Sequence, residues 1–144
     1  METQVLSGIN TNKVYKEAAI QIGTFLGGPL VAGYLIATNF KQLGEDEKVK
    51  KTWLWACIGF VAYMVMATII PETVPAIVFN IIAVAITQVI ILNFQSAQIK
   101  AHIEAGGPLY STRRAVLIGL GIGLIFLALA LGAYFIADAY MLLT

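Results

Sequence analysis

The fold is decided by residues 18–40, which read AAIQIGTFLGGPLVAGYLIATNF and contain no Asp, Glu, Lys, Arg or His. About 20 apolar residues are enough for a helix to cross the ~30 Å hydrocarbon core of a bilayer. Three further charge-free segments follow, at about 52–70, 76–94 and 115–137. We therefore expect an all-α, polytopic membrane protein. Its four transmembrane helices would form an up-down bundle, with residues 1–144 as a single transmembrane domain.

The composition agrees with a membrane protein. The mean hydropathy is +0.83, 59% of the residues are hydrophobic and 12% are charged, whereas soluble domains carry about 25% charged residues. The net charge of +1 provides no basic surface for nucleic acid, so we expect the lipid bilayer and no nucleic acid as partner. Cys57 is the only cysteine, which rules out a disulfide within the chain.

The first segment is interrupted near its middle by Gly27, Gly28 and Pro29. Proline lacks a backbone donor and clashes with the preceding turn, so a kink is expected there. The favoured interpretation is a tolerated kink, and the alternative is a broken helix whose freed backbone groups face a solute. The tetrapeptide Gly-Gly-Pro-Leu recurs at 106–109, which we interpret as chance or a shared local turn.

The third segment continues without Gly or Pro from residue 76 to residue 105. A helix of that length would measure about 45 Å, which exceeds the hydrocarbon thickness. We therefore predict an extension of the third helix, over about residues 95–105, that projects from the membrane on the cytoplasmic side. Gly44 is a candidate C-cap of the first helix, and Ser111 or Thr112 a candidate N-cap of the fourth.

The distribution of basic residues predicts the orientation. With four straight spans, both termini and the turn at 71–75 lie on one side, and loops 41–51 and 96–114 lie on the other. The two loops hold seven Lys and Arg residues and the termini side holds two, Lys13 and Lys16. Because cytoplasmic loops are enriched in Lys and Arg, this bias predicts cytoplasmic loops and both termini outside.

Amides and hydroxyls in the third segment share one helix face, at Asn80, Thr87, Gln88 and Gln95. Such groups in lipid commonly form hydrogen bonds between helices, which is the favoured interpretation. The alternative is a polar path that would also use Gln21 and Pro29.

Small residues predict two surfaces for close helix packing, because helices in lipid associate where backbones can approach closely. The residues are Gly23 and Gly27 in the first span, and Gly119 and Gly123 in the fourth, with Ala128 and Gly132 extending the latter. These surfaces serve either one bundle or contact between protomers.

The sequence contains no nucleophile–base pair, carboxylate dyad or metal-spaced cluster, so we expect no enzyme activity, no cofactor and no metal. The spans also lack the ionisable side chains on which pumps and proton relays depend.

Two stretches, GTFLGGPLVAGYLIATNFKQLG at 23–44 and HIEAGGPLYSTRRAVLIGLG at 102–121, resemble small bacterial four-helix integral membrane proteins. The resemblance implies a bacterial inner (cytoplasmic) membrane and no activity.

The expected role is a non-enzymatic subunit, anchor or assembly partner in a homo-oligomer or a larger membrane complex. The expected partner contact lies on the helix-three extension, at Ile99, Lys100, His102 and Ile103. The alternative is an oligomeric channel or transporter for a small neutral solute or ion. It would use the Gly27–Pro29 break and the polar face of Asn80, Thr87 and Gln88.

Overall fold

The computed structural model describes residues 11–71 and 73–143, which form five helices and, apart from one isolated β-bridge, no β-structure. The helices are α2 (Glu17–Gln42), α3 (Asp46–Ile69), α4 (Ala76–Phe94), α5 (Ser96–Glu104) and α6 (Thr112–Leu143). Four of them, all except α5, are long and apolar enough to cross a membrane. The all-α class and the four long apolar helices are thus confirmed.

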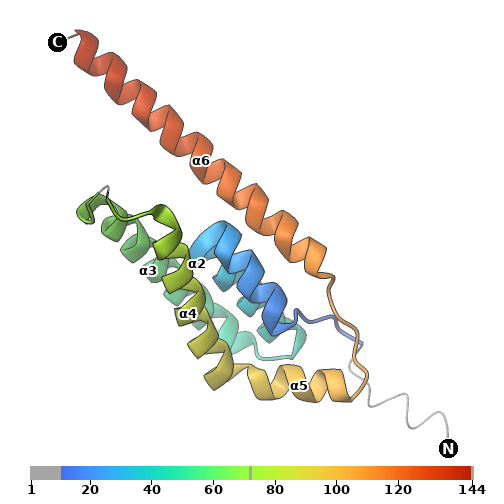
Figure 1. Cartoon of the computed structure of the whole chain (residues 1–144). Coiled ribbons are helices and arrows are strands. Elements are labelled where there is room, and N and C mark those ends of the chain that lie inside the picture. Colours follow the sequence, from blue (N-terminus) through green and yellow to red (C-terminus); the bar gives the residue numbers. More distant parts are fainter. Residues whose placement is uncertain (1–10, 72, 144) are drawn as a thin grey trace, which may run out of the picture.

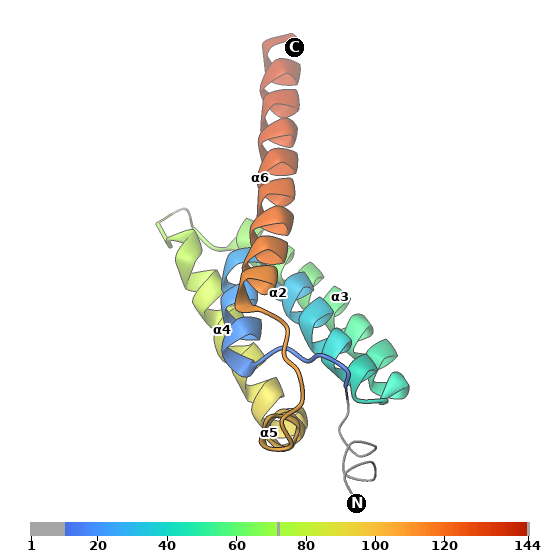
Figure 2. The same cartoon turned by 90° about the vertical axis from the view of Figure 1, so that its right-hand side faces the viewer.

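Helix α2 folds back on itself, so that its two ends lie at the same end of the molecule (Figure 1). Gly28 has non-helical dihedral angles, φ 73° and ψ −162°, and Pro29 begins the returning arm. A Cβ at Gly23 would lie 2.6 Å from the Leu35 side chain, although these residues would be about 18 Å apart along a straight helix. Figure 2 shows the ascending and returning arms side by side.

The expected interruption of the helix at Gly27–Pro29 is confirmed, but it is a reversal rather than a kink. At about 1.5 Å per residue the arms measure about 17 Å and 21 Å, each less than the ~30 Å of a hydrocarbon core. The up-down arrangement of four straight spans therefore does not describe this fold. Glycine is needed at position 28 because its φ lies in the left-handed region.

The open ends of the two arms are joined by the segment that precedes α2. The Asn39 side chain accepts a hydrogen bond from the Tyr15 N–H (2.7 Å) and donates one to the Tyr15 carbonyl (2.9 Å), and both residues are fully buried. Asn12 donates to the Gln42 carbonyl at 3.0 Å. Val14 pairs with Leu109 in the single β-bridge, which ties the same segment to the connection between α5 and α6.

Helix α2 is the centre of the fold, and α3, α4 and α6 all contact it. In its most apolar stretch 56% of the residues are buried, against 17% or less in the other three long helices. The core residues include Ile20, Val31, Leu35 and Ile91. Non-helical backbone at membrane depth is tolerated where protein surrounds it, and the central position of α2 meets that condition.

The predicted straight extension of the third helix is wrong. Helix α4 ends at Phe94, and Gln95, with φ −129°, separates it from α5. Helix α5 lies across the end of the molecule at a steep angle to α4 (Figure 1). The Gln95 side chain is buried and donates to the Ile36 carbonyl at 2.8 Å. No Gly or Pro lies at the bend between α4 and α5. The hydrogen bond from Gln95 to Ile36 is the tertiary contact found there.

Helix α6 begins where the sequence predicts, with Ser111 accepting a hydrogen bond from the Arg114 N–H at 3.4 Å. Its first half packs against α2, and Phe126 meets Phe60 of α3 with ring centroids 4.9 Å apart. From residue 127 to residue 142 every side chain is exposed. Figures 1 and 2 show this half extending beyond the other helices.

We predict that Asn39→Leu destabilises the protein by about 2–4 kcal/mol, because the buried N–H and carbonyl of Tyr15 lose their partner. Thermal unfolding in mild detergent measures the change. The matched control is Asn93→Leu, since exposed Asn93 donates only to the Val89 carbonyl of its own helix and joins no second element. Equal melting temperatures for the two variants would show that Asn39 does not hold the arms of α2 together.

Candidate functional site

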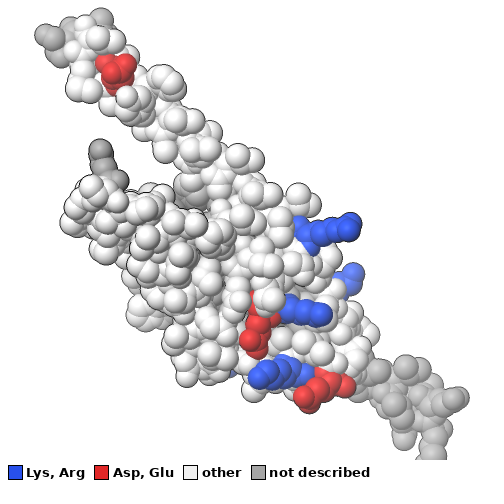
Figure 3. All heavy atoms as spheres, viewed as in Figure 1, with Lys and Arg blue, Asp and Glu red and all other residues white. Residues whose placement is uncertain are grey.

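Charge is gathered at one end of the molecule (Figure 3). Because α2 folds back, Lys13 and Lys16 lie at the same end as loops 41–51 and 96–114, which hold the other seven Lys and Arg residues of the sequence. Asp138 is the one charged residue described near the other end. We call the charged end the basic face. Four straight spans place both termini on one side, whereas here residues 11–16 lie at the basic face and the end of α6 lies at the opposite end of the molecule.

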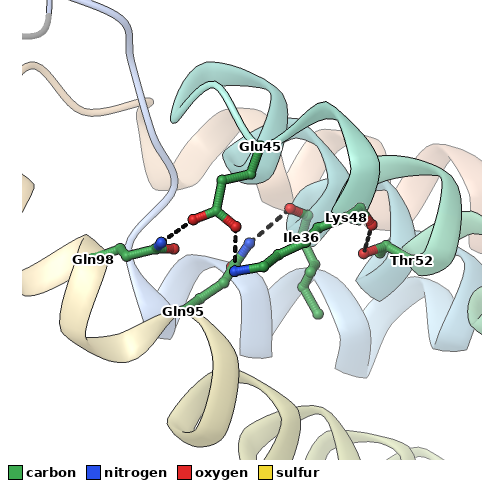
Figure 4. A network of polar contacts seen from close by, with 6 residues as sticks. All are labelled: Ile36, Glu45, Lys48, Thr52, Gln95 and Gln98. Carbon is green, nitrogen blue, oxygen red and sulfur yellow. Dashed lines mark hydrogen bonds and ion pairs between the residues drawn. The ribbon is translucent and has the colours of Figure 1, made fainter.

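A polar network at the basic face joins α5 to the turn between α2 and α3 (Figure 4). The Glu45 carboxylate forms an ion pair with Lys48 and accepts a hydrogen bond from the Gln98 side chain. These contacts, first Lys48 and then Gln98, lower the pKa of Glu45 below its ordinary value. Beside this network, Gln95 reaches across to the carbonyl of Ile36, so both glutamines hold α5 to α2 and α3.

The polar face predicted on the third segment points toward other helices. Gln88 accepts a hydrogen bond from Gln21 of α2, and Asn80 accepts one from the Tyr63 hydroxyl of α3 at 2.9 Å. Thr87 is buried on the same side of α4. These contacts leave the amides engaged with neighbouring helices, which is the arrangement that interhelical hydrogen bonding requires.

The two glycine pairs meet each other across the contact between α2 and α6. A Cβ at Gly119 would lie 2.8 Å from the Gly23 carbonyl oxygen, and one at Gly123 would lie 2.7 Å from that of Leu26. A Cβ at Gly27 would lie 2.9 Å from the Gly119 carbonyl oxygen. Only glycine allows the two backbones to approach this closely.

Ala128 and Gly132 do not extend that surface. Each follows a glycine of the pair by nine residues, and nine steps of about 100° leave a net rotation of about 180°. Gly121 precedes Ala128 by seven residues and Gly132 by eleven, and both intervals are close to a whole number of helical turns. The three residues therefore lie on one face of α6, opposite Gly119 and Gly123. A Cβ at Gly121 or Gly132 would meet nothing within 4 Å. We call Gly121, Ala128 and Gly132 the outer face of α6.

The four residues predicted as a partner contact divide into two pairs. Ile99 and His102 are buried inside the chain at 1% and 6% exposure, while Lys100 and Ile103 are accessible. The His102 ring lies against Gly107, and its Nε2 is 2.9 Å from the Pro108 carbonyl oxygen. The bend at Gln95 turns the apolar side of α5 inward, which removes Ile99 and His102 from any docking surface.

A half-open pocket of about 380 Å³ lies at the basic face between α2, α3 and the start of α6. It is lined by Tyr34, Ala37, Thr38, Lys41, Gln42, Val49, Trp53, Tyr110 and Arg114. Sequence reasoning missed this pocket. Its two cations, Lys41 and Arg114, stand far apart in the chain, and the sequence pattern predicts for them only a place in the two basic loops. The sequence signal for this level of the fold is the pair Trp53 and Tyr110, since such aromatic residues are enriched at membrane boundaries.

Tyr15 does not line the pocket but packs against Tyr110, which does. Its ring stacks on Tyr110 with centroids 4.5 Å apart, and the Arg114 guanidinium lies 4.5 Å from the centre of the Tyr110 ring. Burial raises the pKa of the Tyr15 hydroxyl, and the nearby charge of Arg114 opposes that rise. Among the residues described, no group of three or more His, Cys, Asp or Glu side chains is arranged to hold a metal ion.

The geometry defines an all-α protein with four helices long and apolar enough to span a membrane. No family model, curated protein or solved structure matches the chain.

We predict that acid weakens the contact of α5 through Glu45. A carboxyl whose pKa is lowered on folding stabilises the protein above its unfolded pKa, near 4.5, and loses that contribution as pH falls through the folded pKa. The difference in melting temperature between wild type and Glu45→Gln should therefore be present at pH 7 and vanish near pH 3. It should correspond to less than about 1 kcal/mol, because the pair is partly exposed.

The control for this measurement is Glu104→Gln, which removes a carboxyl at the exposed end of α5. A pH-independent difference for Glu45→Gln, or an equal pH dependence for Glu104→Gln, would contradict the assignment.

Proposed function

We propose that this protein is a non-enzymatic subunit of a membrane assembly, and that it associates through the outer face of α6. The observation that carries the proposal is the projecting half of α6, where residues 127–142 are exposed on all sides. Those residues extend about 24 Å, and the outer face, Gly121, Ala128 and Gly132, offers the close approach that drives helix association in lipid. Both a second copy of the chain and another membrane subunit fit this surface.

The proposed membrane orientation follows from the fold-back of α2. Helix α2 enters and leaves at the basic face, while α3, α4 and α6 cross fully. All nine Lys and Arg residues then lie on one side, which is a stronger bias than the seven against two expected for four straight spans. Because basic residues concentrate in cytoplasmic segments, the basic face, with loops 41–51 and 96–114, would be cytoplasmic. A bacterial inner membrane remains part of the proposal, on the resemblance described above.

We predict that the N-terminal end is cytoplasmic and the C-terminal end is outside. In bacterial cells, a fluorescent protein that matures only in the cytoplasm should be bright on the N-terminus and dark on the C-terminus. An alkaline phosphatase that folds only outside should give the reverse pattern. Four straight spans place both ends on the same side, so equal reporter signals at the two ends would refute the re-entrant arrangement of α2.

We predict that Ala128→Leu combined with Gly132→Leu lowers the mass of the complex purified in mild detergent. Bulky side chains would hold a second helix away from the outer face, and Gly132 has open space around it within the chain, so the fold itself should tolerate the change. Mass measurement of the purified particle, with identification of every bound protein, reports the outcome. The matched control is Ala130→Leu, an exposed position that lies on the opposite side of the projecting half.

Two outcomes would contradict the assembly proposal. One is a wild-type protein that purifies as a lone monomer with nothing bound. The other is an unchanged complex mass in the double variant. Loss of the complex in Ala130→Leu alone would move the contact to the other side of α6.

A channel or transporter for a small neutral solute or ion is the second candidate, and the reversal at Gly28 and Pro29 favours it. Half-helices that meet within a membrane form solute sites in known transporters. The hydrogen bond between Gln21 and Gln88 weighs against an open polar path, because it engages the amides with each other. Flux into proteoliposomes that Gln88→Leu abolishes would favour this candidate over the assembly role.

A further inference from the structure

The pocket at the basic face has the charge of an anion site. Lys41 and Arg114 both line it, and no Asp or Glu does. Within residues 11–71 and 73–143 neither cation forms an ion pair, and the one recorded pair joins Lys48 to Glu45. A guanidinium has five N–H donors in a planar fork that matches the oxygens of a phosphate.

Arg114 is held in position by aromatic side chains that leave its charge uncompensated. Its guanidinium lies over the Tyr110 ring and next to the Tyr34 hydroxyl. The buried Tyr15 hydroxyl also lies close to Arg114 on the side of the guanidinium away from solvent, and it brings no charge of its own. Neutral tyrosines orient the guanidinium but do not balance its charge, so Arg114 remains able to pair with an anion in the pocket.

The remaining walls of the pocket are amphipathic. Thr38 and Gln42 supply polar groups, whereas Ala37, Val49 and Trp53 supply apolar surface. Trp53 is 41% exposed and stands near the start of α3, at the level where tryptophan meets the membrane boundary. A pocket that is basic on one side, apolar on another and half open at that level fits a head group better than a freely diffusing ion.

We infer that this pocket binds the phosphate of an anionic phospholipid in the leaflet at the basic face. Arg114 and Lys41 hold the phosphate oxygens, and the glycerol end of the lipid lies along Val49 and Trp53. Basic pockets between transmembrane helices on the cytoplasmic side are known to hold lipid head groups. The inference uses the membrane orientation proposed above but does not depend on α6-mediated assembly.

The test is a titration of the full-length protein in neutral detergent, followed by native mass spectrometry. The probes are phosphatidylglycerol, phosphatidylcholine and inorganic phosphate. We expect one phosphatidylglycerol to remain bound at concentrations where phosphatidylcholine and phosphate do not. Lys41→Gln should weaken that binding about tenfold or more, as expected on loss of a charge-assisted hydrogen bond. Lys51→Gln, the matched control on the exposed surface of α3, should change it less than about twofold.

Arg114→Lys supplies a second variant, because it retains the charge but removes the planar fork, and it too should weaken binding. Unchanged melting temperatures establish that each variant folds. Equal losses in Lys41→Gln and Lys51→Gln would overturn the pocket in favour of general surface charge. Equal retention of phosphatidylcholine would overturn the charge selectivity. Binding of inorganic phosphate as tight as that of the lipid would overturn the lipid assignment. Because bound lipid is counted for each complex mass separately, this result and the assembly result can fail independently.

Discussion

The pair of hydrogen bonds between Asn39 and Tyr15 closes the arms of α2, and the rest of the structure depends on that closure. The reversal at Gly28 provides the turn, but a turn alone does not set how far the arms separate. Asn39 bonds both the N–H and the carbonyl of Tyr15, which fixes the entering and leaving chain next to each other. The basic face, the pocket beside Arg114 and the placement of residues 11–16 opposite the end of α6 all follow from this contact.

Helix α2 is the least apolar of the four long helices, and it lies at the centre of the fold. It has the lowest mean hydropathy of the four long helices, 1.5, and is also the most buried of them. Gln21 bonds Gln88, and Thr24 donates to the Ile20 carbonyl, so side chains that lipid would not satisfy find partners inside the protein. Glycines at 23, 27 and 119 bring backbones into contact, and that close packing favours α2 at the centre with α3, α4 and α6 around it.

Much of the fold could be predicted from sequence, because helix length and apolar runs are local properties. The end of α3, the start of α4, the positive φ of 80° at Gly44 and the Ser111 cap agree with expectation. Hydropathy, however, does not show whether a helix continues straight or folds back. Residues 18–40 have the same apolar composition in both cases. The tetrapeptide Gly-Gly-Pro-Leu turns the chain at both of its positions, 27–30 and 106–109, but only the second copy stands among polar residues that suggest a loop. The bend at Gln95 and the pocket of Lys41 and Arg114 depend on tertiary contacts that no local pattern contains.

The short reach of the α2 arms has a consequence for α6. Each arm is shorter than a membrane core is thick, so α2 supports α6 only along the first half, through Gly119 and Gly123. Beyond Phe126 the helix is exposed as far as residue 142, and its outer face carries the small residues that favour close helix contact. The folded-back helix α2 therefore produces two unlike regions in one protein. One is a compact basic end whose aromatic and cationic side chains suit a phosphate, and the other is an unsupported apolar end. On the proposed orientation these regions lie in opposite leaflets, so lipid recognition and protein association need not compete for the same surface.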